Sequence, residues 1–503
     1  MKVTFINPCL KKGPQKNQID GGDFSFGIAI LSAHLRQSGI ATSLIQITRD
    51  FTDNEIQSII TAHPSPLYCF YILTHFLAPL KQWIRVIKET TSSFVVCGGT
   101  AVSVNPDEIM EDLGVDAVCI GEGDEALIEL ARSFDSGKID HTIRNLWFRN
   151  KDTIIKNPLR PLWRNLDTLP HYDMTLFDLH NLRTMRYRLP YLPVMVSRGC
   201  AFACSYCSNN RLHGIYKGLG RFVRFMSPKR AVDEIQHMLQ SLNKPTTLNF
   251  SDNTFDTSRK WIFDFCRLYQ KQIGLPFRAM GRVERLDDEI CRILKDAGCF
   301  RFTVGIESGS ENIRYNYLNR RIPDHKILKG ILALRTNGIQ TATYNMCGLP
   351  SETREDMLKT IKLNAAAKVD FASCSIFWPY RGTALYDKAD EQNLICANSN
   401  HRQLSSVYED SILNIDDKLK AHIRFTSQCF FKLVYLYRMC HEGVCLASDT
   451  TEATLDNLYL GDDKGEFIKL FSVLGLNDLE NNLYEKFETP ILHDVSRITG
   501  HPQ

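Results

Sequence analysis

Residues 196–210 read VSRGCAFACSYCSNN, and this stretch contains Cys200, Cys204 and Cys207. It directly follows Pro193–Val196, an apolar run that is typical of a buried strand. Three thiolates in one compact loop can each bind one iron of a [4Fe-4S] cluster. The fourth iron then has no protein ligand, and its open position can be chelated by the amino and carboxylate groups of an amino acid.

Two simpler explanations of the three cysteines are weaker. With 16 cysteines in 503 residues, the spacing CxxxCxxC is expected by chance roughly 0.016 times per chain. A structural zinc site needs four protein ligands, and no fourth Cys or His is paired with these three at close spacing. Most other cysteines lie singly in apolar runs, where a free thiol packs as a small hydrophobic group. The sequence therefore predicts an iron–sulfur cluster.

Strands and helices alternate on the C-terminal side of this stretch. Strands are predicted at Pro193–Val196, Thr247–Phe250, Phe277–Met280, Phe302–Ile306, Thr341–Met346 and Ala372–Phe377. Helices are predicted at Pro228–Leu239, Asp287–Ala297, Asp324–Thr336 and Arg354–Ala366. Six strand–helix repeats predict a partial (β/α)6 barrel over residues 191–390, with chemistry at the carboxyl ends of its strands.

The first 135 residues alternate in the same way. Strands are predicted at Val3–Ile6, Thr42–Ile47, Leu67–Leu73, Phe94–Cys97 and Ala117–Ile120, and helices at Phe26–Gln37, Leu80–Glu89 and Pro106–Leu113. Apolar strands separated by helices predict a doubly wound parallel sheet of the Rossmann or flavodoxin kind, an α/β fold. Ligands bind such a sheet beyond the carboxyl ends of its strands.

The remaining segments are less regular. Residues 136–190 are rich in Arg, Pro, Asn and Trp, and predict a hairpin over Asn145–Ile155 followed by a linker. Residues 391–503 predict a helical C-terminal region. Its aromatic stretch over 425–437 could cover an apolar substrate, but at helical spacing it more often forms core.

The composition excludes several classes of protein. The 60 basic and 57 acidic residues nearly balance, which gives no electrostatic reason to expect a nucleic-acid partner. The first apolar run is broken by Asn7-Pro8 and is too short for a signal peptide. The longest apolar stretch, Phe425–Met439, contains Lys432 and Arg438 and falls short of the roughly 20 residues of a membrane span. We therefore expect a cytoplasmic protein with no membrane span.

The cysteine motif, with Tyr206 before its last cysteine, resembles that of the radical S-adenosylmethionine (SAM) superfamily. The resemblance continues, in the same order, through residues 282–284 (RVE), 305–310 (GIESGS), 347–353 (CGLPSET) and 378–383 (WPYRGT). It implies that a cluster reduced by a donor such as flavodoxin or ferredoxin cleaves SAM. The resulting 5′-deoxyadenosyl radical would then remove a hydrogen atom from the substrate, while the protein supplies positioning and excludes water.

The same resemblance implies the residues that contact SAM. Tyr206 would lie against the adenine or the cluster, and Glu307 would bind the ribose hydroxyls. Ser251 and Asp252 stand where the family holds the methionine amino group, although the usual Gly-Gly-Glu pattern is absent. Arg282 would bind the SAM carboxylate. An alternative is a salt bridge between Arg282 and Glu307 that closes the mouth of the barrel.

The first domain resembles the cobalamin-binding domain that precedes many radical SAM cores, through residues 97–100 (CGGT), 105–108 (NPDE) and 115–125 (VDAVCIGEGDE). The cobalamin contacts that this implies are Thr74, His75, Gly98, Gly99, Gly121, Glu122 and Gly123. Two features depart from the family: there is no DxHxxG motif, and Thr100-Ala101 replaces the His that often follows Gly-Gly. A domain that keeps the fold without cobalamin stays an alternative.

Four functions are compatible with these motifs. The first is a cobalamin-dependent methyltransferase that acts on an unactivated carbon or phosphorus centre of a small molecule or peptide in a biosynthetic pathway. The second is an oxidative cyclase or ring-rearranging enzyme of the same architecture. A methylthiotransferase is less favoured, because it needs a second cluster and Cys9, Cys69, Cys97 and Cys119 all lie in or beside predicted strands. A non-catalytic iron–sulfur protein would leave Glu307 without a purpose.

Overall fold

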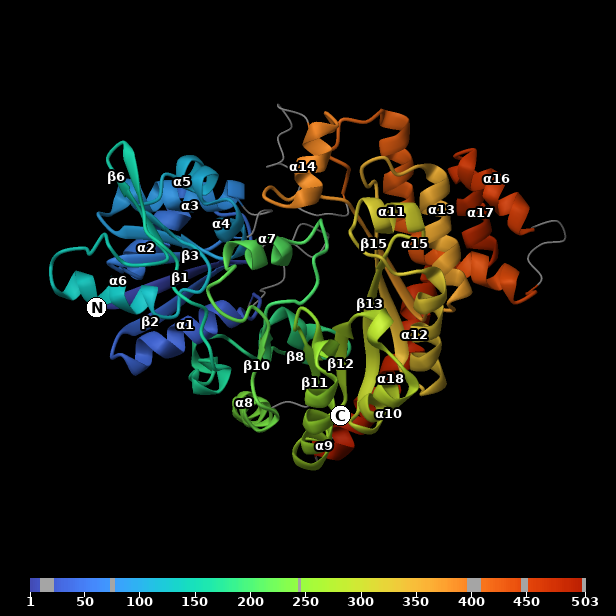
Figure 1. Ribbon diagram of the computed structural model, residues 1–503, viewed down its shortest axis with the longest axis horizontal. Coiled ribbons are helices and arrows are strands. Elements are labelled where there is room, and N and C mark those ends of the chain that lie inside the picture. Colours follow the sequence, from blue (N-terminus) through green and yellow to red (C-terminus); the bar gives the residue numbers. More distant parts are fainter. Residues whose placement is uncertain (10–21, 73–76, 243–245, 396–408, 445–450, 500–503) are drawn as a thin grey trace.

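The computed structural model describes residues 1–9, 22–72, 77–242, 246–395, 409–444 and 451–499. Figure 1 shows two parallel sheets beside each other, with the first sheet formed by the blue N-terminal part of the chain. The second sheet is green to yellow, and the orange and red helices of the C-terminal region pack against its far side. This arrangement confirms the predicted α/β fold class.

The first sheet has the strand order β2-β1-β3-β4-β5-β6-β7, and its first five strands are parallel. These are β1 (Lys2–Pro8), β2 (Ala41–Ile47), β3 (Leu67–Tyr71), β4 (Phe94–Gly98) and β5 (Ala117–Cys119). One face is covered by α1 (Phe26–Gln37) and α6 (Ala126–Asp135). The other face is covered by α2 (Asp53–Ala62), α3 (Leu77–Thr90) and α5 (Pro106–Leu113). The sheet is therefore doubly wound, as predicted.

The predicted hairpin forms β6 (Leu146–Asn150) and β7 (Thr153–Lys156) and joins the edge of this sheet. The sequence predicts this hairpin within the linker of residues 136–190. Strand β6 pairs antiparallel with β5, whose edge would otherwise be open. Two side chains of β6 itself, Leu146 and Phe148, are buried. An unpaired strand edge is prone to aggregation, so the hairpin protects the sheet.

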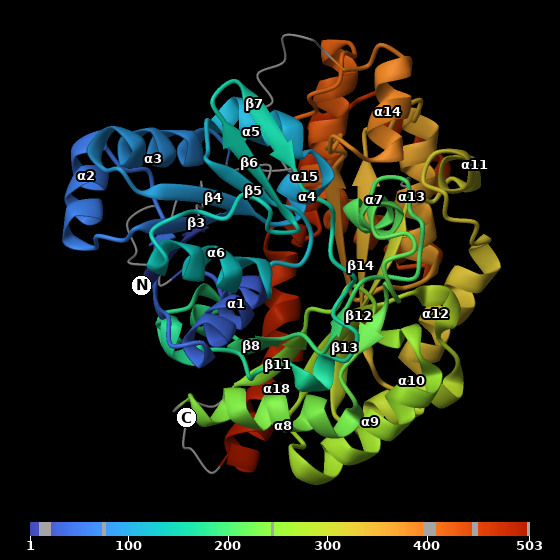
Figure 2. The same ribbon diagram turned by 60° about the vertical axis from the view of Figure 1, so that its left-hand side comes forward.

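The second sheet has the order β15-β14-β13-β12-β11-β8, and all of its strands are parallel. Its strands are β8 (Tyr191–Val194), β11 (Thr247–Phe250), β12 (Phe277–Gly281), β13 (Cys299–Glu307), β14 (Gln340–Cys347) and β15 (Phe371–Ile376). Outside lie α8 (Pro228–Gln240), α9 (Arg259–Gln272), α10 (Asp288–Asp296), α12 (Asp324–Thr336) and α13 (Arg354–Ala366), as Figure 2 shows. The partial barrel is confirmed, with its first strand two residues earlier than predicted.

Several side chains that face the inside of this barrel are partly exposed. On β14, Thr341 and Thr343 face the helices and are buried, whereas Tyr344 faces the inside and is 48% exposed. Strands β12 and β15 alternate in the same way between buried and partly exposed residues. A complete (β/α)8 barrel fills its interior with side chains. The interior of this partial barrel is therefore less completely filled by side chains.

The C-terminal region consists of α14 (Ala384–Glu391), α15 (Asp417–His441), α16 (Glu452–Leu460), α17 (Lys464–Val473) and α18 (Leu479–Thr499). Helix α15 packs against β15 and α13, and its Phe430, Phe431 and Tyr437 are buried in the core. Helix α18 reaches the beginning of β13, where Glu488 lies 3.5 Å from Arg301. None of the helices in the described ranges combines the length and apolarity that a membrane crossing requires.

Candidate functional site

The cysteine loop leaves the carboxyl end of β8 and ends at α7 (Ser208–Ile215). Cys204 is buried, whereas Cys200 and Cys207 are partly exposed. Cys200 Sγ lies 3.1 Å from Thr254 Oγ1, and Asn209 Nδ2 donates to Cys207 Sγ at 3.7 Å. The loop therefore places all three thiols at the end of the barrel where the strands finish.

This donor set fits a [4Fe-4S] cluster. The three thiolates of a cubane cluster bind three different irons, so they need not converge on one position. In the described part of the chain, no three His, Cys, Asp or Glu side chains do converge on a single metal ion. The cluster carries negative charge, and the nearest charged groups to Cys204 are the guanidinium groups of Arg282 and Arg320.

The structure brings Tyr206 and Glu307 together. The Tyr206 hydroxyl donates to Glu307 Oε1 at 2.9 Å, and Arg320 Nη1 lies 3.9 Å from the same oxygen. Burial raises the pKa of Glu307 above its usual range, against the opposing effect of Arg320. Glu307 has a φ of 68°, which is costly for a residue other than glycine and is typical of functional sites.

Arg282 does not form the alternative salt bridge with Glu307. Its Nη2 lies 2.6 Å from Glu284 Oε1, and its guanidinium lies over the ring of Phe202 at 4.2 Å. The partner of Glu307 is Arg320, which the sequence analysis missed. Arg320 follows α11 (Glu311–Asn316) by a few residues and belongs to no motif that we used.

Asp252 lies behind the segment that leads into the cysteine loop. Its side chain is fully buried and accepts hydrogen bonds from the backbone N–H of Val196, at 3.0 Å, and from the Ser197 hydroxyl. Burial raises its pKa to about 6. Asp252 therefore braces the segment that leads into the cysteine loop, and its contact with SAM stays a prediction. The neighbouring Ser251 is partly exposed, and its hydroxyl accepts a bond from Asn249 Nδ2 at 3.0 Å.

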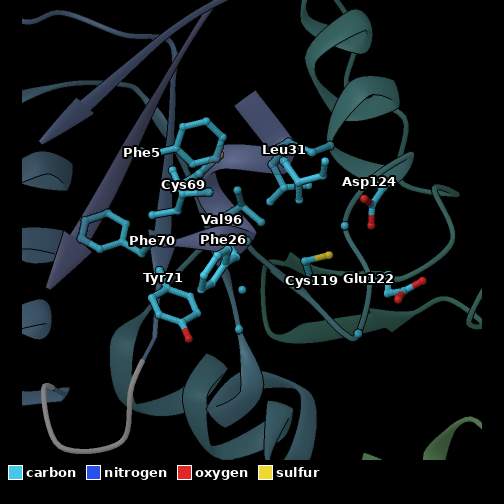
Figure 3. A pocket seen from close by; sticks show the side chains of 18 of the residues that line it. Phe5, Phe26, Leu31, Cys69, Phe70, Tyr71, Val96, Cys119, Glu122 and Asp124 are labelled. Carbon is cyan, nitrogen blue, oxygen red and sulfur yellow. The ribbon is translucent and has the colours of Figure 1, made fainter. Parts of the chain in front are cut away.

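A cavity of about 270 Å³ opens at the carboxyl end of the first sheet. Figure 3 shows the rings of Phe5, Phe26 and Tyr71 on one side of it and the carboxylates of Glu122 and Asp124 on the other. All the predicted cobalamin contacts in the described part of the chain line this cavity, namely Gly98, Gly99, Gly121, Glu122 and Gly123. Thr74 and His75 lie outside the described residues.

Two of these glycines are required by close packing. Gly99 has a φ of 110°, and a Cβ atom there would lie 2.9 Å from the Tyr71 ring. Gly121 has a φ of 77°, and a Cβ atom there would overlap the Tyr216 hydroxyl. Both backbone conformations favour glycine, because L side chains rarely adopt positive φ.

Glu122 and Asp124 connect the cavity to the barrel. Arg198 donates to both oxygens of Asp124, at 3.0 and 3.1 Å, and lies 3.0 Å from Glu122. Arg224 donates to Glu122 at 2.7 Å, and lies opposite Arg198 on the two-stranded ribbon of β9 (Ser197–Arg198) and β10 (Arg224–Phe225). We call these four residues the arginine clamp. Arg198 is followed directly by Gly199 and Cys200, so the clamp joins the cavity to the cysteine loop.

The clamp carboxylates are held in their charged form. Burial alone would raise the pKa of Glu122, but Arg198 and Arg224 lower it below its usual range. The pKa of Asp124 is lowered in the same way, chiefly by Arg198, against the effect of burial. The sequence analysis assigned Glu122 to cobalamin only, because its partners on the ribbon lie 76 and 102 residues further along the chain.

Cys69, Cys97 and Cys119 also line the cavity. Burial raises the pKa of the Cys119 thiol to about 12, and the pKa values of the other two are raised as well. These thiols are therefore protonated at neutral pH, whereas cluster ligands are thiolates.

The chain matches two protein families. Residues 194–363 match the radical SAM superfamily, and residues 23–131 match the B12 binding domain. The first match agrees with the predicted cluster and SAM, and the second agrees with the predicted cobalamin.

The sequence is similar to two relatives over most of its length. An uncharacterized methyltransferase of Pyrococcus horikoshii is 26% identical over 441 residues, which cover 86% of this chain and 91% of the relative. The anaerobic magnesium-protoporphyrin IX monomethyl ester cyclase of Rubrivivax gelatinosus is 22% identical over 404 residues, which cover 78% of this chain and 70% of the relative.

Solved structures share the fold. The cobalamin-dependent SAM radical enzyme OxsB, with aqua-cobalamin and SAM bound, superposes with a TM-score of 0.65 at 15% identity, over 99% of this chain and 75% of that chain. The radical SAM methyltransferase TsrM from Kitasatospora setae, with cobalamin and a [4Fe-4S] cluster bound, superposes with a TM-score of 0.61 at 17% identity, over 79% and 76% of the two chains.

Proposed function

Because the chain belongs to the radical SAM enzymes that carry a B12-binding domain, we propose that it transfers a methyl group to an unactivated carbon or phosphorus centre. The observation that carries this proposal is the arginine clamp, since it ties the cavity of the first sheet to the loop that holds the three cysteines. Methyl transfer requires the two cofactors to act on one substrate. A rigid connection between their sites serves that requirement.

The bound cofactors would supply a hydrogen-abstracting radical from SAM at the cluster and a methyl group on cobalamin. The chain supplies the rest. Cys200, Cys204 and Cys207 would hold the cluster at the end of the barrel. Glu307, which accepts a hydrogen bond from the Tyr206 hydroxyl at 2.9 Å, would bind the ribose hydroxyls of SAM. Arg282 is proposed to reach the SAM carboxylate.

The substrate is proposed to bind on the inner side of the barrel, where Tyr344 is 48% exposed. Enclosure by the strands keeps water away from the substrate radical. The substrate is a small molecule or a peptide, and the reducing electron comes from a carrier such as flavodoxin or ferredoxin. Gly98, Gly99, Gly121 and Gly123 let the backbone come close to cobalamin.

A second candidate is an oxidative cyclase of the same architecture. It is favoured by the similarity to the cyclase of Rubrivivax gelatinosus. The two candidates differ in their products, because methyl transfer consumes a second SAM and releases S-adenosylhomocysteine. A cyclase releases 5′-deoxyadenosine without that coproduct.

The test uses the full chain, purified without oxygen from cells supplied with hydroxocobalamin and reconstituted with iron and sulfide. We expect about four irons per chain and one cobalt, and we expect S-adenosylhomocysteine to form when SAM and a reductant are added. Cys204→Ala should lose the iron but keep the cobalt, whereas Cys440→Ala, which changes a thiol of α15, should keep both. Full cobalt with 5′-deoxyadenosine as the sole product would reject methyl transfer and favour the cyclase.

A further inference from the structure

Cys204 differs from the two other cysteines of its loop. Its side chain is buried, with the residue 8% exposed. Within the described residues, its sulfur accepts hydrogen bonds from two cationic side chains, whereas the sulfurs of Cys200 and Cys207 accept none of this kind. Arg282 Nη1 lies 3.3 Å from Cys204 Sγ, and Arg320 Nη1 lies 3.8 Å from it. One sulfur therefore has two guanidinium groups beside it.

Both arginines are fixed in place by other contacts. The Arg282 backbone N–H donates to Asp256 at 3.0 Å, and its Nε donates to Glu284 at 2.8 Å. Arg320 donates to the Gly305 carbonyl oxygen and lies 3.4 Å from the Tyr206 hydroxyl. Side chains anchored in this way keep their distance to the sulfur when the cluster changes charge.

Both arginines are buried, at 8% and 3% exposed. An arginine side chain is not deprotonated in proteins, and Arg320 Nη1 also lies 3.9 Å from Glu307 Oε1. Its positive charge is therefore retained inside the protein. Water screens such a charge weakly at a buried position, so it acts strongly on its neighbours.

The charge of the cluster grows when it is reduced. One electron passes from an external one-electron carrier to the cluster, the carrier is oxidised by one electron, and no bond forms or breaks. Hydrogen bonds to the sulfur ligands and nearby positive charges stabilise the more negative state. We propose that Arg282 and Arg320 raise the reduction potential of the cluster through the Cys204 sulfur. The inference rests on the cluster and holds for a methyltransferase and a cyclase alike.

The test is an anaerobic redox titration of the reconstituted full chain, without SAM, with the reduced cluster followed by electron paramagnetic resonance. Arg320→Gln should move the midpoint potential to a more negative value, since it removes the charge. Arg320→Lys keeps the charge with fewer donors and should move it less. Arg321→Gln is the matched control, because it removes the same charge from the next residue, whose side chain is exposed. It should titrate as the unaltered protein does.

A variant of opposite sign separates charge from loosened packing. Glu284→Gln removes the negative charge that faces Arg282 at 2.6 Å and should move the midpoint to a less negative value. If Arg320→Gln fails to hold its iron, Glu284→Gln and Arg320→Lys decide the question. Equal midpoints for these variants and the unaltered protein would overturn the inference, and so would a shift of Arg321→Gln as large as that of Arg320→Gln.

Discussion

At the scale of single residues, the barrel domain contains three buried carboxyl groups that favour the protonated form. Burial raises the pKa of Asp252 to about 6, of Asp256 to about 7 and of Glu352 to about 8. Glu352 accepts a hydrogen bond from the Leu349 backbone N–H at 3.1 Å through one oxygen. Its other oxygen has no hydrogen-bond partner in the structure. These groups make the stability of the protein sensitive to pH.

We expect Glu352→Gln to flatten this dependence. The folded chain keeps the Glu352 proton up to about pH 8, whereas the unfolded chain loses it near pH 4.3. The folded state binds more protons in that window, so the free energy of unfolding falls as the pH rises through it. Glutamine keeps the hydrogen bond and does not titrate. Urea unfolding at about pH 5 and pH 8 measures how much the free energy of unfolding changes with pH in the unaltered protein and in Glu352→Gln. An equal change in the two proteins would reject the prediction.

The sequence identified the residues whose role follows from local spacing. Cys200, Cys204 and Cys207 lie within eight residues of one another, and their spacing alone indicates a cluster. Arg320 was missed because it meets Cys204 across 116 residues of chain. Asp252 was assigned to SAM from its position after a strand, and only the packing shows that its side chain turns inward.

At the scale of helices and strands, agreement was good wherever burial forces an apolar pattern. The bounds of α1, α12 and α13 are those predicted, because these helices combine an apolar face with clear ends. The position of the hairpin was not predictable in the same way. Its place depends on the open edge of β5, which is a property of the assembled sheet.

The cavity of the first sheet can be tested by filling it. Cys119 ends β5, and its sulfur lies beside Gly123, where a Cβ atom would be 3.3 Å away. We expect Cys119→Phe to weaken cobalamin binding by at least tenfold, because the ring would occupy the apolar space of the cavity. The iron content should not change.

Cys119→Ser is the matched control, since it alters the same position without filling the space. A spectroscopic titration with hydroxocobalamin gives the dissociation constants, and a metal analysis gives the iron. Unchanged binding by Cys119→Phe would mean that cobalamin does not use this cavity.

At the scale of the whole molecule, the arginine clamp holds the two sheets in one relative position. We expect Arg198→Gln to lower the free energy of unfolding by about 3–5 kcal/mol, because Glu122 and Asp124 would be left buried with less compensation. The side chains of Arg198, Glu122 and Asp124 are 21%, 20% and 5% exposed. The clamp is thus shielded from solvent.

Arg160→Gln is the control for the clamp. Its partners Glu125 and Glu129 are 55% and 45% exposed, and such pairs contribute about 1 kcal/mol or less. The clamp should also weaken in acid, since the pKa values of Glu122 and Asp124 are lowered by folding and their contribution disappears as the pH falls below about 4. Denaturant unfolding curves give the free energy of unfolding of both variants. Equal losses for Arg198→Gln and Arg160→Gln would show that the clamp stabilises the protein no more than an exposed ion pair does.

Helix α18 has a consequence for how the protein is made. Its Glu488 pairs with Arg301 near the beginning of β13, and its Phe487 packs against Phe371 at the beginning of β15. Every strand of the barrel leaves the ribosome before this helix does, and domains begin to fold during translation. The nascent barrel is therefore uncovered at the end opposite the cysteines until late in synthesis.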